Sequence, residues 1–431
     1  MSPRWGNWAR EQFCAPSSIV RPTSEAELAD VVSRAAQRGE RVRAVGTGHS
    51  FTDCACTDGT MIDMTGLHRV LDADPATGLV TIEGGAKLHT LGPQLAARGL
   101  GLENQGDIDA QSITGATATA THGTGARFTN LSARIVGLRL VTASGEVLSL
   151  TQGSDGDDFL AARVAIGALG VISQVTVQTV PLYTLHRNDE RRALTETLQR
   201  LDEFVDSNDH FEFFVFPYGD TALTRSTRRS DEEPTPTPEW KRKFGEDFEN
   251  VGLSLVCRAG RALPAAAPRL NRLMTSLISE STVADRAYKV YATERKVRFT
   301  EMEYAIPREH AREAVQRVID LVHRRGLPIM FPLEVRFSAP DDSFLSTAHG
   351  RDTCYIAVHQ YTGMEFETYF RAVEAIMDDY AGRPHWGKRH YQTAATLRER
   401  YPDWDRFAAV RDRLDPNRAF LNEYTRRVLG E

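Results

Sequence analysis

The sequence lacks the features that would assign it at once to several function classes. It has only five cysteines, an odd and scattered set with no Cys-x-x-Cys pair, so neither a disulfide framework nor a zinc or other metal site is indicated. It has no basic excess, because 52 Lys and Arg stand against 58 Asp and Glu in 431 residues, a formal charge of −6. A polyanion-binding protein normally carries a basic excess, so we expect no nucleic acid partner.

Long apolar runs are also missing. No window of about 18 apolar residues is present, which predicts no integral membrane segment. The segment from Met1 to Glu11 has charged residues and tryptophans where a signal peptide would have an apolar run. We therefore expect a cytoplasmic protein, and peripheral attachment to a membrane stays open.

Two common nucleotide-binding motifs are absent as well. No glycine cluster matches a Walker A loop or a Gly-x-Gly-x-x-Gly motif that enters a helix, which argues against P-loop chemistry and a Rossmann site. The glycines gather instead at 46–48, 84–85 and 123–125, beside predicted strand or helix ends. Backbone N–H groups and hydroxyls along 45–50 and 112–125 suit a pyrophosphate, although small residues also permit tight packing.

Hydrophobic periodicity predicts a mixture of helices and strands. Ser24 opens a capping box and an apolar-periodic helix to about Arg38, and residues 41–45 then form a strand. A helix at 88–98 and a hairpin at 134–150 follow. The length predicts two or three domains, and the pattern is of the α+β class.

The second half continues this mixture. Pro307 and Gly326 bracket a predicted helix, and strands are expected at 330–337 and 354–361, followed by a helix at 365–380. Aromatic stretches such as 211–216 are interpreted as core.

Polar residues stand at period-two spacing on the two late strands. Glu334 and Arg336 would point to one face of their strand, and His359 and Tyr361 repeat that geometry on the next. Lys388 lies in a segment with Pro384 and Gly387 that predicts a fixed loop. A solvated face or a structural ion pair is the simpler interpretation of such spacing alone.

Six segments, in order along nearly the whole chain, resemble those of a known family. The resemblance is to the aldonolactone oxidoreductases, FAD enzymes of the vanillyl-alcohol-oxidase type, and most of all to their actinobacterial L-gulono-1,4-lactone dehydrogenases. The segments are Val45-Gly-Thr-Gly-His-Ser50, Asp58-Gly-Thr-Met-Ile-Asp-Met64, Thr121-His-Gly-Thr-Gly125, Glu334-Val-Arg336, Arg383-Pro-His-Trp-Gly-Lys388 and Leu414-Asp-Pro416.

The resemblance implies a two-domain α+β fold of the vanillyl-alcohol-oxidase (PCMH) type. Residues 1–180 would form the FAD-binding domain, and 181–382 the α+β substrate (cap) domain of the D-arabinono-lactone-oxidase type. Residues 383–431 would return to the FAD domain and the active site.

The resemblance also implies an FAD cofactor, attached covalently through the ring of His49 to the flavin 8α carbon. A neutral imidazole is a suitable nucleophile for that bond. Gly106 would lie over the flavin edge, where some dehydrogenases of the family carry alanine, and Asp107 departs from the serine of alditol oxidase. The predicted cofactor-binding residues are Val45, Gly46, Thr47, Gly48, His49, Ser50, Gly106, Asp107, Ser112, Gly115, Ala116, Thr117, Ala118, Thr121, His122, Gly123, Gly125 and Ile172.

The implied reaction is oxidation of a sugar lactone, such as L-gulono-1,4-lactone, at C2, with hydride transfer to flavin N5 and enolisation of the product to ascorbate. Arg336 and Lys388 would stabilise the developing alkoxide, and Glu334 would orient the hydroxyls. His359 and Tyr361 would complete the catalytic set. Whether Glu334, Lys388 or His359 is the base stays open.

The resemblance leaves three alternatives. The electron acceptor is either a cytochrome c-like carrier, which overall similarity favours, or O2, which Gly106 favours. The substrate is a lactone or an alditol, because His359 resembles the residue of alditol oxidase, which together with D-arabinono-1,4-lactone oxidase would use O2 and produce H2O2. A catalytically silent flavin-binding protein is the alternative of another class.

Overall fold

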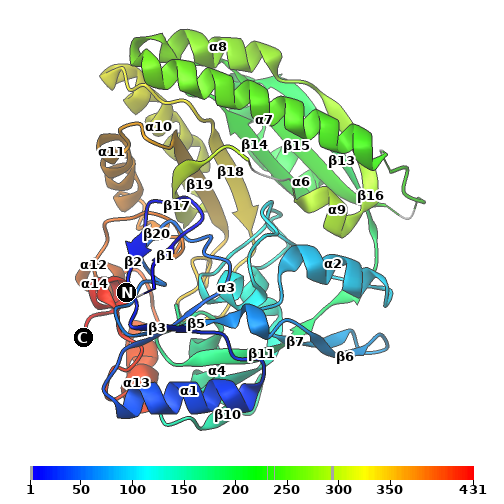
Figure 1. The fold of residues 1–431 in the computed structure, drawn as a ribbon. Helices are drawn as coiled ribbons and strands as arrows, with labels where there is room; N and C mark the ends of the chain where they lie inside the picture. The colour runs from blue at the N-terminus through cyan, green and yellow to red at the C-terminus, as the bar shows by residue number, and fades with distance from the viewer. Residues whose placement is uncertain (1–2, 231, 237, 293–295) are drawn as a thin grey trace.

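The computed structural model describes residues 3–230, 232–236, 238–292 and 296–431. The chain forms two layered regions that contact each other (Figure 1). The N-terminal region and the C-terminal helices form the lower part of the view, and the middle of the chain forms the upper part around a large sheet.

The N-terminal region contains two larger sheets and two two-stranded ones, β1-β2 and β12-β8. β3, β5 and β4 form a parallel three-stranded sheet, and β10-β9-β11-β7-β6 is the order of an antiparallel five-stranded one. The bounds are β1 (Trp5–Gly6), β2 (Phe13–Cys14), β3 (Ser18–Val20), α1 (Glu25–Gln37), β4 (Val42–Val45), β5 (Thr60–Asp63), β6 (Val70–Asp74), β7 (Leu79–Glu83), α2 (Leu88–Ala96), β8 (Leu100–Gly101), α3 (Ile113–Ala118), β9 (Ile135–Val141), β10 (Val147–Thr151), α4 (Gly156–Arg163), β11 (Val171–Gln178) and β12 (Val180–Pro181).

The middle of the chain forms an eight-stranded antiparallel sheet of order β16-β13-β15-β14-β18-β19-β17-β20. The bounds are β13 (Thr184–Ala193), α5 (Leu194–Gln199), α6 (Leu201–Ser207), β14 (His210–Val215), β15 (Thr221–Ser230), α7 (Glu239–Ala262), α8 (Ala267–Leu277), β16 (Ser281–Arg286), α9 (Ala287–Tyr291), β17 (Phe299–Pro307), α10 (Ala311–Arg325), β18 (Leu333–Ser338), β19 (Thr353–Tyr361), α11 (Glu367–Asp378) and β20 (Arg383–Pro384).

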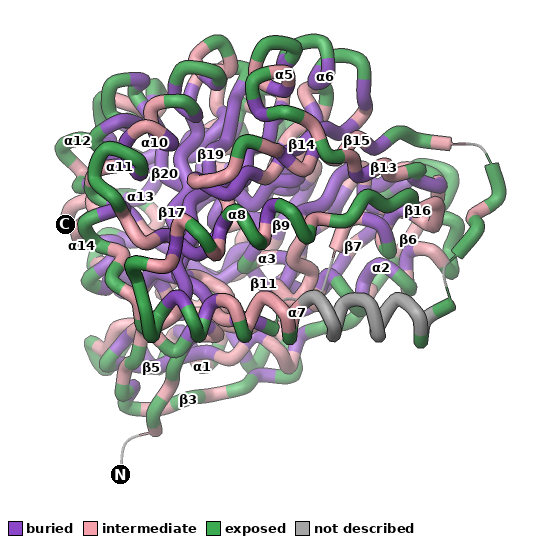
Figure 2. The backbone as a smooth tube through the Cα atoms, turned by 90° about the horizontal axis from the view of Figure 1, so that it is seen from above, coloured by how far each residue is buried: buried purple, intermediate pink, exposed green. Residues whose placement is uncertain are grey.

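β18 and β19 are buried along their whole length and β17 at all but its last residue, so the middle of the sheet lies inside the molecule (Figure 2). The two faces of these strands differ in chemistry. One face is apolar and packs against α10 and α11, through Met302, Tyr304 and Ile306 of β17 and their neighbours on β14, β18 and β19. The other face carries the alternate residues, several of them charged, because successive side chains of a strand point to opposite sides. Buried charges on one face indicate that this face meets another polar surface.

The C-terminal segment returns to the N-terminal region. Its helices are α12 (Ala394–Arg398), α13 (Trp404–Leu414) and α14 (Glu423–Leu429). Trp386, Trp404 and Tyr424 lie in the same core as Leu88 and Leu138 of the N-terminal region. The chain thus runs from the last strand of the large sheet into the N-terminal core, which fixes the loop around residue 388 between the two regions.

Several predicted elements are confirmed, and some begin later than expected. In α1 the Ser24 Oγ accepts a hydrogen bond from the Glu27 N–H at 3.2 Å, which is one half of the predicted capping box. The Glu27 carboxylate accepts from the Thr23 N–H and not from Ser24. The helix expected from Pro307 begins at Ala311, because residues 308–310 form a tighter 3-10 turn. β18 begins at Leu333 because Pro332 has no N–H to give to the sheet. No helix among the described residues is long and apolar enough to cross a membrane.

Candidate active site

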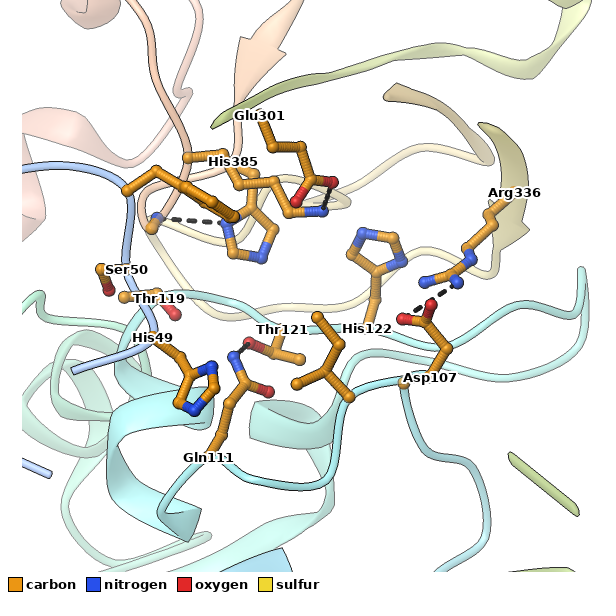
Figure 3. Close-up of a pocket in the computed structure, with 15 residues that line it drawn as sticks. His49, Ser50, Asp107, Gln111, Thr119, Thr121, His122, Glu301, Arg336 and His385 are labelled. Atoms are coloured by element: carbon orange, nitrogen blue, oxygen red, sulfur yellow. Dashed lines mark hydrogen bonds and ion pairs between the residues drawn. The ribbon is translucent and has the colours of Figure 1, made fainter. Parts of the chain in front are cut away.

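A cavity of about 520 Å³, called the main cavity below, lies between the charged face of the large sheet and loops of the N-terminal region (Figure 3). Its lining residues are His49, Ser50, Phe51, Gly106, Asp107, Ile108, Gln111, Thr119, Thr121, His122, Glu301, Arg336, His385, Gly387 and Lys388.

The strand register brings the charged residues of the sheet together. Glu301 of β17 is opposite His359 of β19, and Glu334 of β18 is opposite Ala357 of β19. Directly opposed residues of antiparallel strands point to the same face. Glu301, Glu334 and His359, together with Arg336, therefore share the face that meets the N-terminal loops.

Lys388 enters this face from the loop after β20. Its Nζ lies 2.6 Å from Glu301 Oε1 and 2.6 Å from Glu303 Oε2, and both carboxylates are buried. Burial alone would lower the pKa of Lys388, but the two carboxylates outweigh it and hold this pKa above its ordinary value. Lys388 is therefore an ammonium at neutral pH and cannot act as a base there.

Both nitrogens of His359 are occupied. Nδ1 lies 3.1 Å from the Pro332 carbonyl oxygen, which only accepts, so Nδ1 carries the hydrogen; Nε2 lies 3.2 Å from Glu301 Oε1. Burial alone would lower the pKa of His359, but the Glu301 carboxylate outweighs it and raises this pKa. A bond from Nε2 to a carboxylate requires a proton between them, so His359 has no free lone pair to offer a substrate.

His122 repeats this arrangement with Glu303. Its Nδ1 lies 2.8 Å from the Gly123 carbonyl oxygen and its Nε2 3.2 Å from Glu303 Oε1. His385 differs, because burial and the charge of Lys388 lower its pKa to about 3, and its Nδ1 accepts the Gly387 N–H at 3.1 Å.

Arg336 lies at the centre of a second charged group. Its Nε donates to Glu212 Oε2 at 2.8 Å, its Nη2 lies 3.1 Å from Asp107 Oδ1, and it forms an ion pair with Glu334. Burial alone would lower the pKa of Arg336, but the carboxylates outweigh it and raise this pKa well above its ordinary value. Burial raises the pKa of Glu334 to about 7, although Arg336 opposes that shift. Glu334 is thus a carboxyl group that titrates near neutrality beside a permanent cation.

His49 lies at the other end of the main cavity from Arg336 and Asp107 (Figure 3). Burial, with the charge of Lys87, lowers the pKa of His49 to about 4, so the ring is neutral at physiological pH. The Trp8 ring stacks on it, with centroids 5.5 Å apart and planes 22° apart. Gly48 has φ +69°, a left-handed conformation that lets the chain turn just before this histidine.

Glycines of the N-terminal loops allow close packing of the chain, and one of them also lines the main cavity. A Cβ at Gly46 would lie 2.0 Å from Ser112 Oγ, and one at Gly123 would lie 2.4 Å from Asn104 Oδ1, so both loops have no room for a side chain. At Gly106 the nearest atom to an added Cβ would be the His122 carbonyl oxygen, at 3.0 Å. Only the last of these three glycines lines the main cavity.

The structure gathers some of the predicted cofactor-binding residues at the main cavity and leaves others in the packing around it. His49, Ser50, Gly106, Asp107, Thr121 and His122 line the cavity. Residues that are buried in the surrounding core are Val45, Ala116, Thr117 and Ile172. The remaining members lie in the loops beside β4 and next to or within the short helix α3, and they are Gly46, Thr47, Gly48, Ser112, Gly115, Ala118, Gly123 and Gly125. Their contacts with a cofactor stay predictions.

Four of the five predicted catalytic residues come together, namely Glu334, Arg336, Lys388 and His359. Tyr361 does not join them, because its ring packs in an apolar cluster with Phe299 and Phe331. Its catalytic role stays a prediction.

Sequence reasoning missed the carboxylates that hold the cations. Glu301 and Glu303 alternate with apolar residues on β17, and Glu212 does the same on β14. Charged residues at every second position of a fully buried strand are the signal that could have revealed them. His385 also lines the main cavity but was given no role.

His122, Glu303 and His385 offer ligand atoms that all lie within 4.8 Å of one another, a spacing that a metal ion could use. The Lys388 ammonium lies 2.6 Å from Glu303 and supplies a positive charge at the same carboxylate. The charge of this carboxylate is therefore balanced by the chain itself.

Comparison with known proteins identifies the family. Residues 175–428 match the family model of D-arabinono-1,4-lactone oxidase, and residues 16–151 match the model of an FAD binding domain. The chain belongs to the aldonolactone oxidoreductase family. L-gulono-1,4-lactone dehydrogenase of Mycobacterium tuberculosis is 80% identical over 430 residues, which cover 100% of both chains. L-gulonolactone oxidase of Bos taurus is 34% identical (99% of this chain, 98% of that protein), and alditol oxidase of a Streptomyces species is 30% identical (100% of both).

Solved structures of the same fold include a cholesterol oxidase. Cholesterol oxidase from B. sterolicum has a TM-score of 0.85 at 17% identity and covers 100% of this chain and 97% of that chain. This likeness and the FAD binding domain confirm the predicted α+β fold of the vanillyl-alcohol-oxidase type. This aldonolactone oxidoreductase is therefore an enzyme with an FAD-binding domain, and the resemblance of its six segments is confirmed.

Proposed function

We propose that this aldonolactone oxidoreductase oxidises L-gulono-1,4-lactone, or a related aldono-1,4-lactone, at C2 to give L-ascorbate or its analogue. The observation that carries the proposal is a single cavity lined by two cations, Arg336 and Lys388, and by a neutral histidine, His49. The 80% identity to an L-gulono-1,4-lactone dehydrogenase over its full length supports the choice of substrate.

The residues of the main cavity fit a flavin. Gln111, Thr119 and Thr121 present amide and hydroxyl groups along its wall. Arg336 of the sheet and Lys388 of the loop after β20 add two cations. FAD bound there would supply a two-electron acceptor for the hydride that leaves C2. A covalent bond from His49 is supported by its low pKa, because the neutral ring keeps a lone pair for attack.

Each charged side chain then has a distinct task. Lys388 and Arg336 donate hydrogen bonds to the substrate oxygens and stabilise the negative charge that develops on the C2 oxygen. Glu334 accepts the hydroxyl proton, since Lys388 is held as an ammonium and His359 has both nitrogens occupied. A carboxyl group with a pKa of about 7 is well matched to proton transfer at neutral pH.

Reoxidation by a cytochrome c-like carrier is our proposal for the second half of the reaction, supported by the name of the relative at 80% identity. Oxygen is the second candidate, because Gly106 lines the main cavity without a side chain. We further propose a cytoplasmic location. The domain limits proposed are 1–180 and 383–431 for the FAD-binding part and 181–382 for the substrate domain, supported by the shared core of the two terminal segments.

A product assay tests the proposed function. The purified protein with FAD, L-gulono-1,4-lactone and oxidised cytochrome c should form ascorbate and reduced cytochrome c in a ratio of one to two. A second candidate substrate is an alditol, favoured by the histidine at position 359. If the enzyme turns over xylitol faster than any aldonolactone, the proposed substrate is an alditol and not a lactone.

A further inference from the structure

A second cavity, of about 380 Å³, adjoins the main cavity, and none of the roles proposed above uses it. The two cavities share Asp107 and Arg336, which face each other at one end of the main cavity (Figure 3). Beyond this pair the second cavity is lined by Gln105, Glu212 and Thr227, among others. It therefore begins beside the cation at which the lactone is proposed to react.

The charged groups around the second cavity are paired with one another. Arg225 Nη1 lies 3.0 Å from Glu212 Oε1, and Arg225 Nε lies 2.9 Å from Asp189 Oδ1. The other oxygen of Glu212 accepts from Arg336. Burial lowers the pKa of His210 to about 4, so this ring adds no charge at neutral pH. Paired charges suit a neutral, polar ligand better than a phosphate or a carboxylate, which would need an uncompensated cation.

Two polar side chains of the second cavity have unused hydrogen-bonding groups. Within the described part of the chain, neither the Gln105 carboxamide nor the Thr227 hydroxyl has a hydrogen-bond partner, and both residues are buried, at 4% and 5% exposed. Neither group is among the fully buried polar atoms without a partner in the described residues, so both stay accessible from the second cavity. A ligand hydroxyl both donates and accepts, which matches a carboxamide as well as a threonine hydroxyl.

We propose that the second cavity binds the hydroxylated side chain of the substrate, the carbons that an aldono-1,4-lactone carries outside its ring. This inference rests on the proposed function and extends it from the reaction to the choice among lactones. With its ring at Arg336 and Lys388, the lactone places its side chain past Asp107, where Gln105 and Thr227 bond its hydroxyls. A site built to bond a hydroxyl discriminates against an analogue that lacks it.

A series of three lactones tests the proposal. L-gulono-1,4-lactone has two side-chain carbons, a five-carbon aldono-1,4-lactone has one, and L-threono-1,4-lactone has none. Thr227→Val should lower kcat/KM for the six-carbon lactone about 2- to 10-fold, since one neutral hydrogen bond is lost, and should leave the four-carbon lactone within about 2-fold. Thr227→Leu, whose larger side chain would fill part of the second cavity, should lower kcat/KM for the six-carbon lactone by about 10-fold or more. It should again leave kcat/KM for the four-carbon lactone within about 2-fold.

Thr224→Val is the matched control, because Thr224 is a buried threonine of the same strand whose hydroxyl bonds the Glu190 carbonyl at 3.1 Å. It should not change the ranking of the lactones. Calorimetric titration of the dithionite-reduced holoenzyme, in which no turnover occurs, should give the same ranking as dissociation constants.

Equal losses on all three lactones, or none, in the Thr227 variants would overturn the inference and leave the proposed function intact. If the unmodified holoenzyme oxidises none of the three lactones, the proposed function fails first, and the calorimetric ranking then decides the binding proposal alone.

Discussion

Lys388, which is partly buried, forms an ion pair with the buried Glu303, in which the lysine Nζ lies 2.6 Å from the carboxylate Oε2. Glu301 contacts the same ammonium from the next residue on that face of β17. The two carboxylates fix the position of the ammonium and keep it protonated. We therefore propose that Lys388 acts as a fixed hydrogen-bond donor and not as a base.

This geometry predicts the effect of removing the ammonium. Lys388→Met should slow flavin reduction by L-gulono-1,4-lactone about 100-fold or more, because a donor aimed at the developing alkoxide is lost, and KM should change far less. Rapid-mixing absorbance under anaerobic conditions measures the rate. Arg371→Met, at an exposed residue of α11, is the control. An unchanged reduction rate in Lys388→Met would rule out the assigned role.

The same ion pair predicts a stability effect. Lys388→Met leaves Glu301 and Glu303 buried without their shared cation, which should lower the free energy of unfolding by about 3 to 5 kcal/mol. The double variant Lys388→Met/Glu303→Gln removes one of those charges and should recover part of the loss. Denaturant unfolding of the unmodified protein, of each single variant (Lys388→Met and Glu303→Gln) and of the double variant gives the comparison. Additive losses in the double variant would show that the two residues are not coupled.

The raised pKa of Glu334 leads us to expect that flavin reduction depends on pH. Below its pKa of about 7 the carboxyl is protonated and cannot accept the substrate proton, so the rate of flavin reduction should rise with pH through this value. The groups that face it are Arg336, Asp107, Glu212 and His359. Glu334→Gln should be slow and should lose this ionisation. A Glu334→Gln enzyme with the same pH profile as the unmodified protein would assign the base elsewhere.

The proposed covalent bond between His49 and FAD can be tested by denaturation. Denaturation in trichloroacetic acid should leave FAD on the unmodified polypeptide and release it from His49→Ala. Trp8, whose ring stacks on His49, and the other lining residues of the main cavity are unchanged in this variant, so FAD should still bind without a covalent bond. Flavin that remains on the His49→Ala polypeptide after denaturation would refute the linkage.

The missing side chain at Gly106 leads us to expect that this position controls the reaction of the reduced flavin with O2. A Cβ at this position would lie 3.0 Å from the His122 carbonyl oxygen, so this oxygen must move by a few tenths of an ångström to make room for it. Gly106 lines the main cavity, so the added methyl group would lie at the cavity wall. Gly106→Ala should slow reoxidation by O2 about 10-fold or more while flavin reduction by the lactone changes little. Equal reoxidation rates would show that access at this residue does not control the reaction with oxygen.

Much of this architecture follows from local sequence signals. Ser24 caps the predicted helix, and Gly326 ends α10 in a left-handed conformation with φ +61°. The alternation of Glu334 and Arg336 correctly predicts that they share a face. These signals depend only on residues a few positions apart.

The rest depends on strand order and register, which a single sequence does not contain. Glu301 and Lys388 meet only because β17 lies between β19 and β20 at one end of the large sheet. Tyr361 has the same spacing from His359 as Arg336 has from Glu334, yet its ring lies among Phe299 and Phe331, because the sheet face becomes apolar there. Spacing predicts the face of a strand but not what covers it.

The most direct test of the central claim is the anaerobic visible spectrum of the purified protein before and after addition of L-gulono-1,4-lactone. Bleaching of the oxidised-flavin band at about 450 nm in the time of mixing would establish the lactone as electron donor to bound FAD, as we expect. A band that persists with the lactone would contradict the proposed substrate, and a protein without such a band would contradict the assignment of the main cavity to FAD.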